Sequence, residues 1–294
     1  MRRKRSKGLW SPTVAGTGWG ESTFAEMSWD KSRSAALRWA VFGLLVGALV
    51  GVVAFAPAAW LARAVASATD QRLLLADARS SVWAGSAVLV LTGGPESRDA
   101  SALPGRIEWT LGLAGLALEL RARHACCLNG PVAVRLRPGL GRMSFTLLPS
   151  PGWTGQWPSA WLGGLGTPWN TLQLGGALRL VSPGLTIESV QGRWRVEGRA
   201  EVELLGVSSR LTTLDPLGNY RLTLSGNAAQ AGVAQINLST TDGALQLSGD
   251  GTWGPGGVRF RGEARAGAAD EPALTNLLNI IGRRDGARSV ISIG

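Results

Sequence analysis

An uncharged stretch of 24 residues, from Trp39 to Ala62, lies between Arg38 and Arg63 near the start of the chain. As a helix with a rise of about 1.5 Å per residue it would be roughly 36 Å long, against a hydrocarbon core of about 30 Å. Trp39 and Trp60 would lie where aromatic belts form at membrane surfaces. The pattern predicts one transmembrane helix, which we place at residues 36–66.

After this helix, polar and apolar residues alternate along most of the chain, which is typical of antiparallel strands with one buried and one wet face. The clearest alternating segments are Arg106–Leu111, Leu116–Arg121, Val132–Arg137, Gly176–Leu180, Leu185–Glu188, Arg193–Glu197, Ala200–Leu204, Tyr220–Leu224, Gln235–Leu238, Ala244–Ser248 and Val258–Arg265. Asp242-Gly243, Asp250-Gly251 and Gly218-Asn219 are typical of turns between strands.

Two segments have a helical pattern, Pro158–Leu165 and Glu271–Ile281, and Ser289–Ile293 reads as a last strand. A sheet of so many strands must twist and curl. The predicted fold is therefore mainly β. It has one N-terminal transmembrane helix, then a long, strongly twisted antiparallel sheet or half-open barrel with one or two short helices.

The basic residues predict the orientation in the membrane. Residues 1–38 contain eight basic and three acidic residues, whereas the 232 residues from Arg63 on contain 22 basic and 17 acidic ones. The denser positive charge keeps the N-terminus in the cytoplasm. We expect a disordered basic cytoplasmic tail at 1–35, the transmembrane helix at 36–66, and a β-rich domain at 67–294 on the other side.

A cleaved signal peptide is the alternative to this anchor. Ala64–Ala66 or Ala66–Ala68 would fit a cleavage site. The apolar core of a signal peptide spans about 7–15 residues, however, and this stretch is much longer. An uncleaved anchor is therefore the preferred interpretation.

The composition argues against several classes of function. The net charge of +10 suggests nucleic-acid binding, but half of it lies before the span, and the rest is spread thinly along a long domain. The sole histidine, His124, is expected to be structural, at a loop or turn position. No GxSxG nucleophile motif occurs, and Glu201 and Glu203 alternate on one solvated face. We predict no catalytic site, no metal site and no cofactor, and a protein that is not an enzyme.

Cys126 and Cys127 are adjacent, so they form no framework of spaced disulfides. Three states stay open: a disulfide between neighbours, a buried thiol pair, and a bond to a partner chain. Inert packing of the pair is the preferred interpretation.

Two groups of residues are candidate partner-binding sites. Gly43, Gly47 and Gly51 recur every four residues and would leave one helix face open to another helix, although glycine is also common in membrane helices. Four tryptophans lie close together, at Trp153, Trp157, Trp161 and Trp169. They would form an exposed anchor for a partner or pack beneath the strands.

Several segments, in this order, resemble the type II secretion system protein N family. They are Ser81–Gly85 (SVWAG), Leu103–Trp109 (LPGRIEW), Pro168–Gly176 (PWNTLQLGG), Leu247–Trp253 (LSGDGTW) and Leu277–Gly294, which together extend the resemblance over about Leu75–Gly294. The long tail before the span departs from the family pattern and leaves its role open.

The resemblance implies a non-catalytic, single-pass inner-membrane protein whose C-terminal domain is periplasmic. It would contribute to the export of folded periplasmic proteins across the outer membrane. Its expected partners are the platform proteins C, L and M of type II secretion, the outer-membrane secretin and inner-membrane lipid, and not nucleic acid. The alternative function is an anchored β-groove protein that binds or transfers lipid.

Overall fold

The computed structural model describes residues 19–190, 193–226, 232–254, 256–267 and 269–294. The chain divides into two units, of which the first ends at Phe55 and the second begins at Ala56. Each unit is described by itself. Residues 1–18 of the predicted tail lie outside the described residues, and residues 19–35 belong to the first helix.

The first unit is built on helix α1 (Trp19–Ala54), and its apolar part, Ala36–Ala54, is long enough to cross a membrane, with a mean hydropathy of 2.1 over 19 residues. A single helix over 36–66 is not formed. The chain is non-helical at Pro57, and helix α2 (Ala58–Ala68) begins directly after it. Proline has no backbone N–H to donate and disfavours a helical conformation in the residue before it, so the apolar stretch is divided here.

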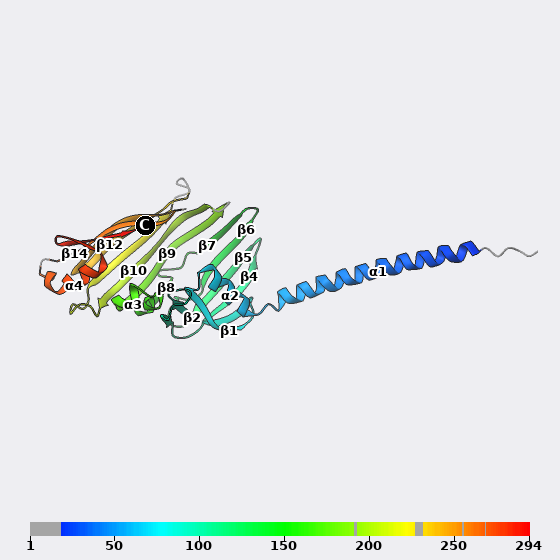
Figure 1. Ribbon diagram of the computed structural model, residues 1–294, viewed down its shortest axis with the longest axis horizontal. Coiled ribbons are helices and arrows are strands. Elements are labelled where there is room, and N and C mark those ends of the chain that lie inside the picture. The colour runs from blue at the N-terminus through cyan, green and yellow to red at the C-terminus, as the bar shows by residue number, and fades with distance from the viewer. Residues whose placement is uncertain (1–18, 191–192, 227–231, 255, 268) are drawn as a thin grey trace, which may run out of the picture. The chain divides into compact units, whose positions relative to one another are not determined.

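The second unit is one 16-stranded antiparallel sheet (Figure 1). Its strands are β1 (Leu73–Ser80), β2 (Ala84–Thr92), β3 (Ala100–Ala102), β4 (Ile107–Ala114), β5 (Ala117–His124), β6 (Val132–Gly139), β7 (Arg142–Leu147), β8 (Gly155–Pro158), β9 (Leu174–Val190), β10 (Arg193–Ser209), β11 (Gly218–Gly226), β12 (Ala234–Gly243), β13 (Leu245–Gly254), β14 (Gly257–Ala266), β15 (Arg283–Asp285) and β16 (Arg288–Ile293). The hydrogen-bonded path runs from β1 to β15, and β15 follows β16 at its end. Among the described residues β1 pairs with neither β15 nor β16, so the sheet is not closed, and the predicted mainly β fold is confirmed.

Two of the strands, β9 and β10, are each 17 residues long and join segments that the sequence pattern separates. The register between them shifts at Arg199–Glu201, which marks a bulge. At this point a Cβ atom on Gly198 would lie 2.3 Å from the carbonyl oxygen of Gly184, and Gly198 has a φ of +98°. Glycine is needed here because no side chain fits, and the bend that it allows curls the sheet.

Consecutive residues along a strand face opposite sides, and directly paired residues of neighbouring strands share a side. We call the side that carries Leu204, Leu222 and Leu238 the inner face, and the opposite side, with Glu201 and Glu203, the outer face. The pairing continues the inner face into the first strands, where Phe145 lies opposite Ile187.

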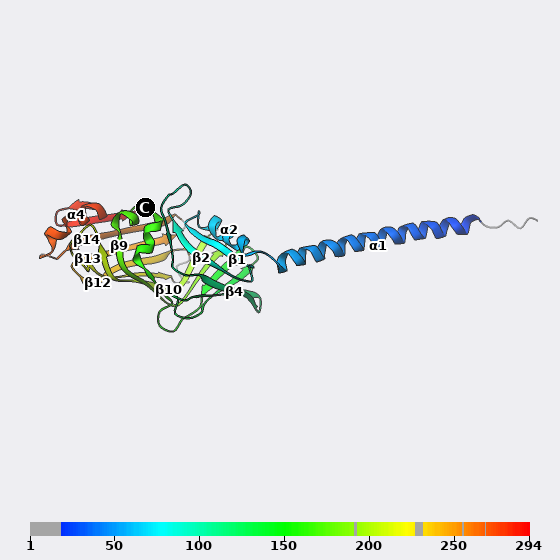
Figure 2. The ribbon, with the colours of Figure 1, turned by 90° about the horizontal axis from the view of Figure 1, so that it is seen from below.

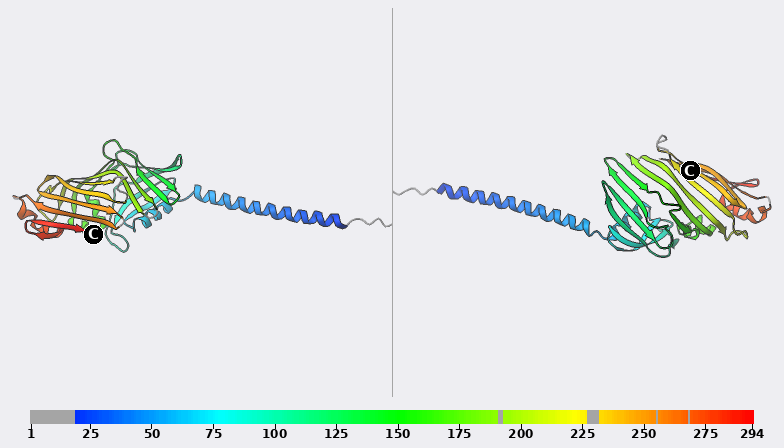
Figure 3. Two further views of the ribbon diagram at one scale, coloured as in Figure 1. Left: turned by 90° about the horizontal axis from the view of Figure 1, so that it is seen from above. Right: turned by 180° about the vertical axis from the view of Figure 1, so that it is seen from behind.

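Short helices cover the two ends of the inner face (Figures 1 and 2). At the first end, Ala58 of α2 packs against Ala87 and Trp109 of the sheet, all three buried. At the other end, α4 (Glu271–Ile281) buries Leu274 and Leu278 in the larger apolar cluster. Seen from behind, the strands lie in front of these helices (Figure 3).

The two predicted short helices are present. Glu271–Ile281 forms α4 with the expected bounds, whereas Pro158–Leu165 forms a 3₁₀ helix, η1 (Ser159–Leu165), followed by the one-turn α3 (Trp169–Leu172). The turn at Asp242-Gly243 ends β12 as expected. The turn expected at Asp250-Gly251 is wrong, because both residues lie inside β13.

A candidate binding groove on the inner face of the sheet

The candidate site is an apolar groove in the C-terminal half of the inner face. Cross-strand pairs build its floor, with Leu222 opposite Leu238 and Leu247 opposite Ala264. The groove has a volume of about 790 Å³, within the range of about 300–1,000 Å³ typical of ligand pockets. Its main apolar lining residues from the strands are Leu174, Leu204, Val207, Leu222, Ile236, Leu238, Leu247, Val258, Phe260, Ile291 and Ile293.

Helices complete the groove at its end and rim. Leu277, Ile280 and Ile281 of α4 line it, as do Trp169 and Leu172 of α3. Because α4 is amphipathic, it buries Leu277 in the core and leaves Ile280 with 44% of its surface exposed. The helix therefore both seals the core and forms one wall of the groove.

Three glycines on the inner face make room for the ring of Phe260, which lines the groove. Gly249 lies opposite Gly262, and Gly251 lies opposite Phe260. Cβ atoms on Gly249 and Gly251 would lie 2.5 and 2.9 Å from atoms of the Phe260 ring, and one on Gly262 would also lie 2.9 Å from it. The aromatic ring therefore occupies the space above the three glycines, and no other residue fits these positions without displacement.

Polar groups are few in this groove. Among the described residues that line it, Arg283 is the single charged one, and it is exposed. The hydroxyl of Ser209 donates to the Leu172 carbonyl oxygen at 2.5 Å and is therefore engaged. Tyr220 is 2% exposed and its hydroxyl has no partner within the described part of the chain, and burial raises its pKa well above the ordinary value.

The outer face of the same strands is charged and paired. Glu201 binds Arg199 at 2.8 Å and Arg221 at 3.4 Å, and Glu203 binds Arg221 at 3.2 Å and Arg179 at 3.8 Å. Glu201 and Glu203 are thus surface carboxylates held in ion pairs, as the alternation predicts. Each carboxylate has an arginine partner, so neither resembles a free general base.

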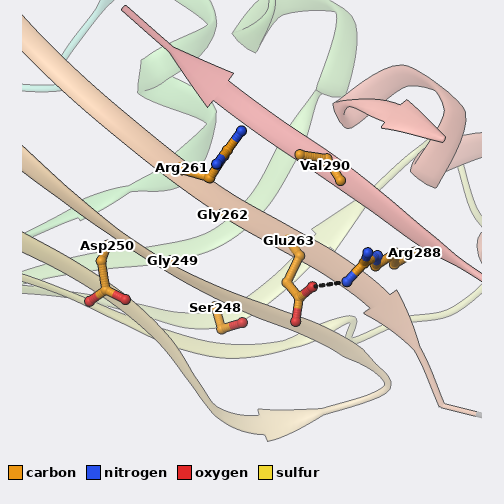
Figure 4. Close-up of a pocket in the computed structure, with 8 residues that line it drawn as sticks. All are labelled: Ser248, Gly249, Asp250, Arg261, Gly262, Glu263, Arg288 and Val290. Carbon is orange, nitrogen blue, oxygen red and sulfur yellow. Dashed lines mark hydrogen bonds and ion pairs between the residues drawn. The ribbon is translucent and has the colours of Figure 1, made fainter. Parts of the chain in front are cut away.

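A polar depression of about 490 Å³ lies further along the outer face (Figure 4). Ser248, Asp250 and Glu263 line it, and the Glu263 carboxylate contacts Arg288 at 3.4 Å and Arg265 at 2.9 Å. Glu263 of β14 and Arg288 of β16 thus pair across neighbouring strands, and Asp250 accepts a hydrogen bond from Asn237 at 2.8 Å. The depression is therefore a part of the ion-paired outer face and not a second apolar site.

His124, Cys126 and Cys127 form a separate cluster after β5. Cys126 and Cys127 are joined by a disulfide, which corrects the preferred interpretation of an unbonded, inert pair. The last residue of β5 is His124, buried rather than in a loop, because it pairs with Ile107. Burial lowers the pKa of this histidine, and its Nδ1 lies 3.3 Å from Cys126 Sγ.

The ligand atoms of these three residues lie within 4.8 Å of one another, a spacing compatible with a metal ion. Metal binding to cysteine requires a thiolate, and both sulfurs are bonded to each other instead. The cluster in this state does not supply a metal-ligand set.

The predicted partner-binding residues lie in three kinds of surroundings: the open surface of a helix, contacts within the fold, and the groove. On α1, a Cβ atom on Gly43, Gly47 or Gly51 would meet nothing within 4 Å, so these positions are open. Trp161 is half-buried and donates from Nε1 to the Ser101 carbonyl oxygen at 3.0 Å, which is a structural role.

The other tryptophans of this group are also half-buried, and the structure does not gather the four into one exposed patch. The Trp157 ring lies against Gly155, where a Cβ atom would come within 2.6 Å of it. Trp169 lines the groove, and Trp153 offers its carbonyl oxygen to Asn129 at 3.1 Å. Of the group, Trp169 alone lines the candidate site.

Apart from Trp169, the groove residues were not singled out by sequence reasoning. The signal was present in the period-two series Leu245, Leu247, Gly249, Gly251 and Trp253, which keeps one face apolar through the two glycines. Interpreting Asp250-Gly251 as a turn interrupted that series.

Comparison with known proteins assigns the family. The family model for type II secretion system protein N matches residues 71–291, which include almost the whole sheet. No curated protein and no solved structure matches the chain. With three quarters of its length inside one family model, the chain belongs to the type II secretion system protein N family.

Proposed function

We propose that the chain is a non-catalytic inner-membrane subunit of the type II secretion system. It contributes to the export of folded periplasmic proteins across the outer membrane through protein–protein contacts. The observation that carries this proposal is the family match over residues 71–291. The apolar segment Ala36–Ala54 supports membrane attachment.

The proposal includes a topology, with the N-terminus in the cytoplasm and the sheet in the periplasm. The dense basic charge before the span supports it, and so does the Cys126–Cys127 disulfide, since such bonds persist in oxidising compartments. Helix α2 supports an uncleaved anchor, because Ala58 is 1% exposed against Trp109 and Ala87. Cleavage after Ala66 or Ala68 would remove this helix from the folded unit.

Reporter fusions test the topology. Alkaline phosphatase fused after Gly294 is expected to be active, and a fluorescent protein that folds only in the cytoplasm is expected to stay dark at the same position. Sequencing of the mature N-terminus is expected to return the residues before α1. An active cytoplasmic reporter at Gly294 would overturn the topology.

The expected partners are the platform proteins C, L and M and the secretin, contacted in part through the glycines of α1. Because nothing fills the space beside Gly47, Gly47→Leu leaves the chain's own fold intact and blocks close approach of a partner helix. Ala48→Leu changes the adjacent helix face and is the matched control. Crosslinking to platform proteins is expected to fall several-fold in G47L and to stay normal in A48L.

Gene deletion tests the function itself. A deletion strain is expected to retain folded exoproteins in the periplasm, and the full chain supplied in trans is expected to restore their release. If exoproteins reached the medium at the normal rate without the chain, and no platform protein co-purified with it, the proposed function would be wrong.

A further inference from the structure

We propose that the inner-face groove binds the acyl chains of a membrane phospholipid. The inference stands on the groove and does not depend on the secretion assignment. Three observations carry it: the chemistry of the groove walls, the pairing of the strands that form its floor, and the charge at its mouth.

The walls match an acyl chain in chemistry. Leu222, Leu238 and Phe260 form a floor without charge, and the hydroxyl of Tyr220, which also lines the groove, is itself buried. The inner face also carries apolar residues past the groove, at Ile187 and the exposed Phe145, which lie opposite each other on β9 and β7. Burial of apolar area drives such binding without directional contacts.

The backbone of the floor favours lipid over a peptide. Strands β11, β12 and β13 are each paired on both sides, so their N–H and C=O groups are already engaged. An extended peptide buried on this floor would need partners for its own N–H and C=O groups and would find almost none. An acyl chain has no polar groups to satisfy along its length.

Part of strand β16, at the edge of the groove, is paired on one side only. The pairing of β15 with β16 stops at Val290, so within the described part of the chain Ile291–Ile293 pair with β14 on one side and with no strand on the other. A strand from a protein partner would be expected there, at the edge, rather than on the floor. This separates the two kinds of occupant by position.

The mouth of the groove carries a positive charge. Arg283 is exposed and forms no ion pair within the described residues, and no carboxylate is among the described residues that line the groove. A guanidinium group suits the phosphate of a lipid headgroup whose chains lie inside.

The membrane that α1 is suited to cross would be the source of the lipid. Only Phe55–Pro57 separate the end of α1 from the start of α2, and α2 packs on the sheet. The folded unit that contains the groove is thus attached by a very short connection to a helix suited to a membrane.

Photolabelling of the full chain tests the inference. The chain is reconstituted in vesicles of phosphatidylethanolamine and phosphatidylglycerol that contain phosphatidylglycerol with a diazirine in one acyl chain. After illumination, labelled peptides are identified by mass spectrometry. We expect label on α1, as in any membrane helix, and on the inner-face residues of β11–β14, with little on the outer-face residues between them.

Matched variants on β12 make the test specific. Leu238→Glu places a carboxylate on the floor, Leu238→Trp fills the floor without a charge, and Ser239→Glu places the same carboxylate on the outer face opposite Arg221. We expect both Leu238 variants to reduce sheet labelling about tenfold relative to α1, and S239E to leave it unchanged. Circular dichroism checks the folding of each variant, and L238W decides the outcome if L238E does not fold.

Three results would overturn the inference. Sheet labelling that stays unchanged in folded L238W would do so, and so would equal labelling of inner and outer faces. The third is a protein, including a second copy of this chain, crosslinked to the floor in place of lipid. A second experiment compares labelling by diazirine-bearing phosphatidylglycerol and phosphatidylcholine. The unmodified chain is expected to be labelled more by phosphatidylglycerol, and Arg283→Gln is expected to remove this difference. An undiminished difference in R283Q would overturn the role of the headgroup contact.

Discussion

The inner and outer faces of strands β9–β14 are built from alternate residues of the same segments, yet they leave different groups available. On the outer face, carboxylates and guanidinium groups meet in pairs across the strands, as at Glu201 and Arg199. On the inner face, Leu222, Leu238 and Phe260 remain partly open to the groove.

This difference shows where binding energy is available. An exposed ion pair has satisfied its own charges and contributes little to stability, about 0–1 kcal/mol. Partly exposed apolar area still gains about 25 cal/mol for each Å² that a ligand covers. The inner face is therefore the surface on which a partner or ligand gains most.

The largest effect is expected where the inner face is sealed by α4. Leu278 is fully buried in the core cluster, so Leu278→Ala is expected to lower the free energy of unfolding by about 2–5 kcal/mol. Ile280, two residues further on, is 44% exposed, and Ile280→Ala is expected to cost less than about 1 kcal/mol. Denaturant titration of both variants in detergent measures the difference; equal losses would show that α4 does not seal the core.

The next largest effect is expected at the three glycines that pack against the Phe260 ring. A Cβ atom on Gly249 would lie 2.7 Å from the Gly262 Cα and 2.5 Å from the Phe260 ring, so Gly249→Val is expected to cost about 1–3 kcal/mol. On β4, Gly112 has open space around it, and Gly112→Val is expected to be nearly neutral. Thermal unfolding followed by circular dichroism compares the two. If G249V were as stable as G112V, the packing of the Phe260 ring would not require glycine at position 249.

The smallest effect is expected on the outer face, at Glu119. Hydrogen bonds from Arg135 and Arg121 hold the pKa of its carboxyl below the ordinary value of 4.5. Because the folded-state pKa is the lower one, the pair stabilises the fold fully above about pH 4.5 and loses this contribution as the pH falls through the folded-state pKa.

A pair of variants isolates this contribution. Glu119→Gln is expected to lower the denaturant midpoint slightly at pH 7 and to flatten its decline below pH 4.5. Glu108 is exposed and forms no ion pair among the described residues, so Glu108→Gln is expected to keep the wild-type pH profile. If the denaturant midpoint of E119Q kept the pH dependence of the wild-type chain, the ion pairs of Glu119 would not contribute to that dependence.

Local pattern predicted much of this molecule. Period-two alternation predicted an antiparallel, strongly curled sheet with one apolar face, and the acidic start and glycine stop of Glu271–Ile281 predicted α4. These features depend on residues close in sequence. The same alternation correctly predicted that Glu201 and Glu203 lie on the charged side.

Other features depend on distant residues and were not predicted. Gly251 reads as a turn residue after Asp250, because its partner Phe260 is known only once β13 and β14 are paired. One helix was predicted over residues 36–66, whereas the structure has α1 up to Ala54 and α2 from Ala58, since the Leu and Ala residues after Pro57 suit a membrane helix and a helix packed on Trp109 equally well. The buried position of His124 likewise follows from its pairing with Ile107.

Complementation with the paired β12 variants tests most directly whether the inner-face groove, proposed to bind lipid, is needed for the proposed role in secretion. Leu238→Glu and Ser239→Glu are expressed in a deletion strain at equal membrane abundance, and exoprotein in the medium is measured. The account predicts that S239E restores release and L238E does not. Equal release by both variants, or loss of release in S239E alone, would contradict it.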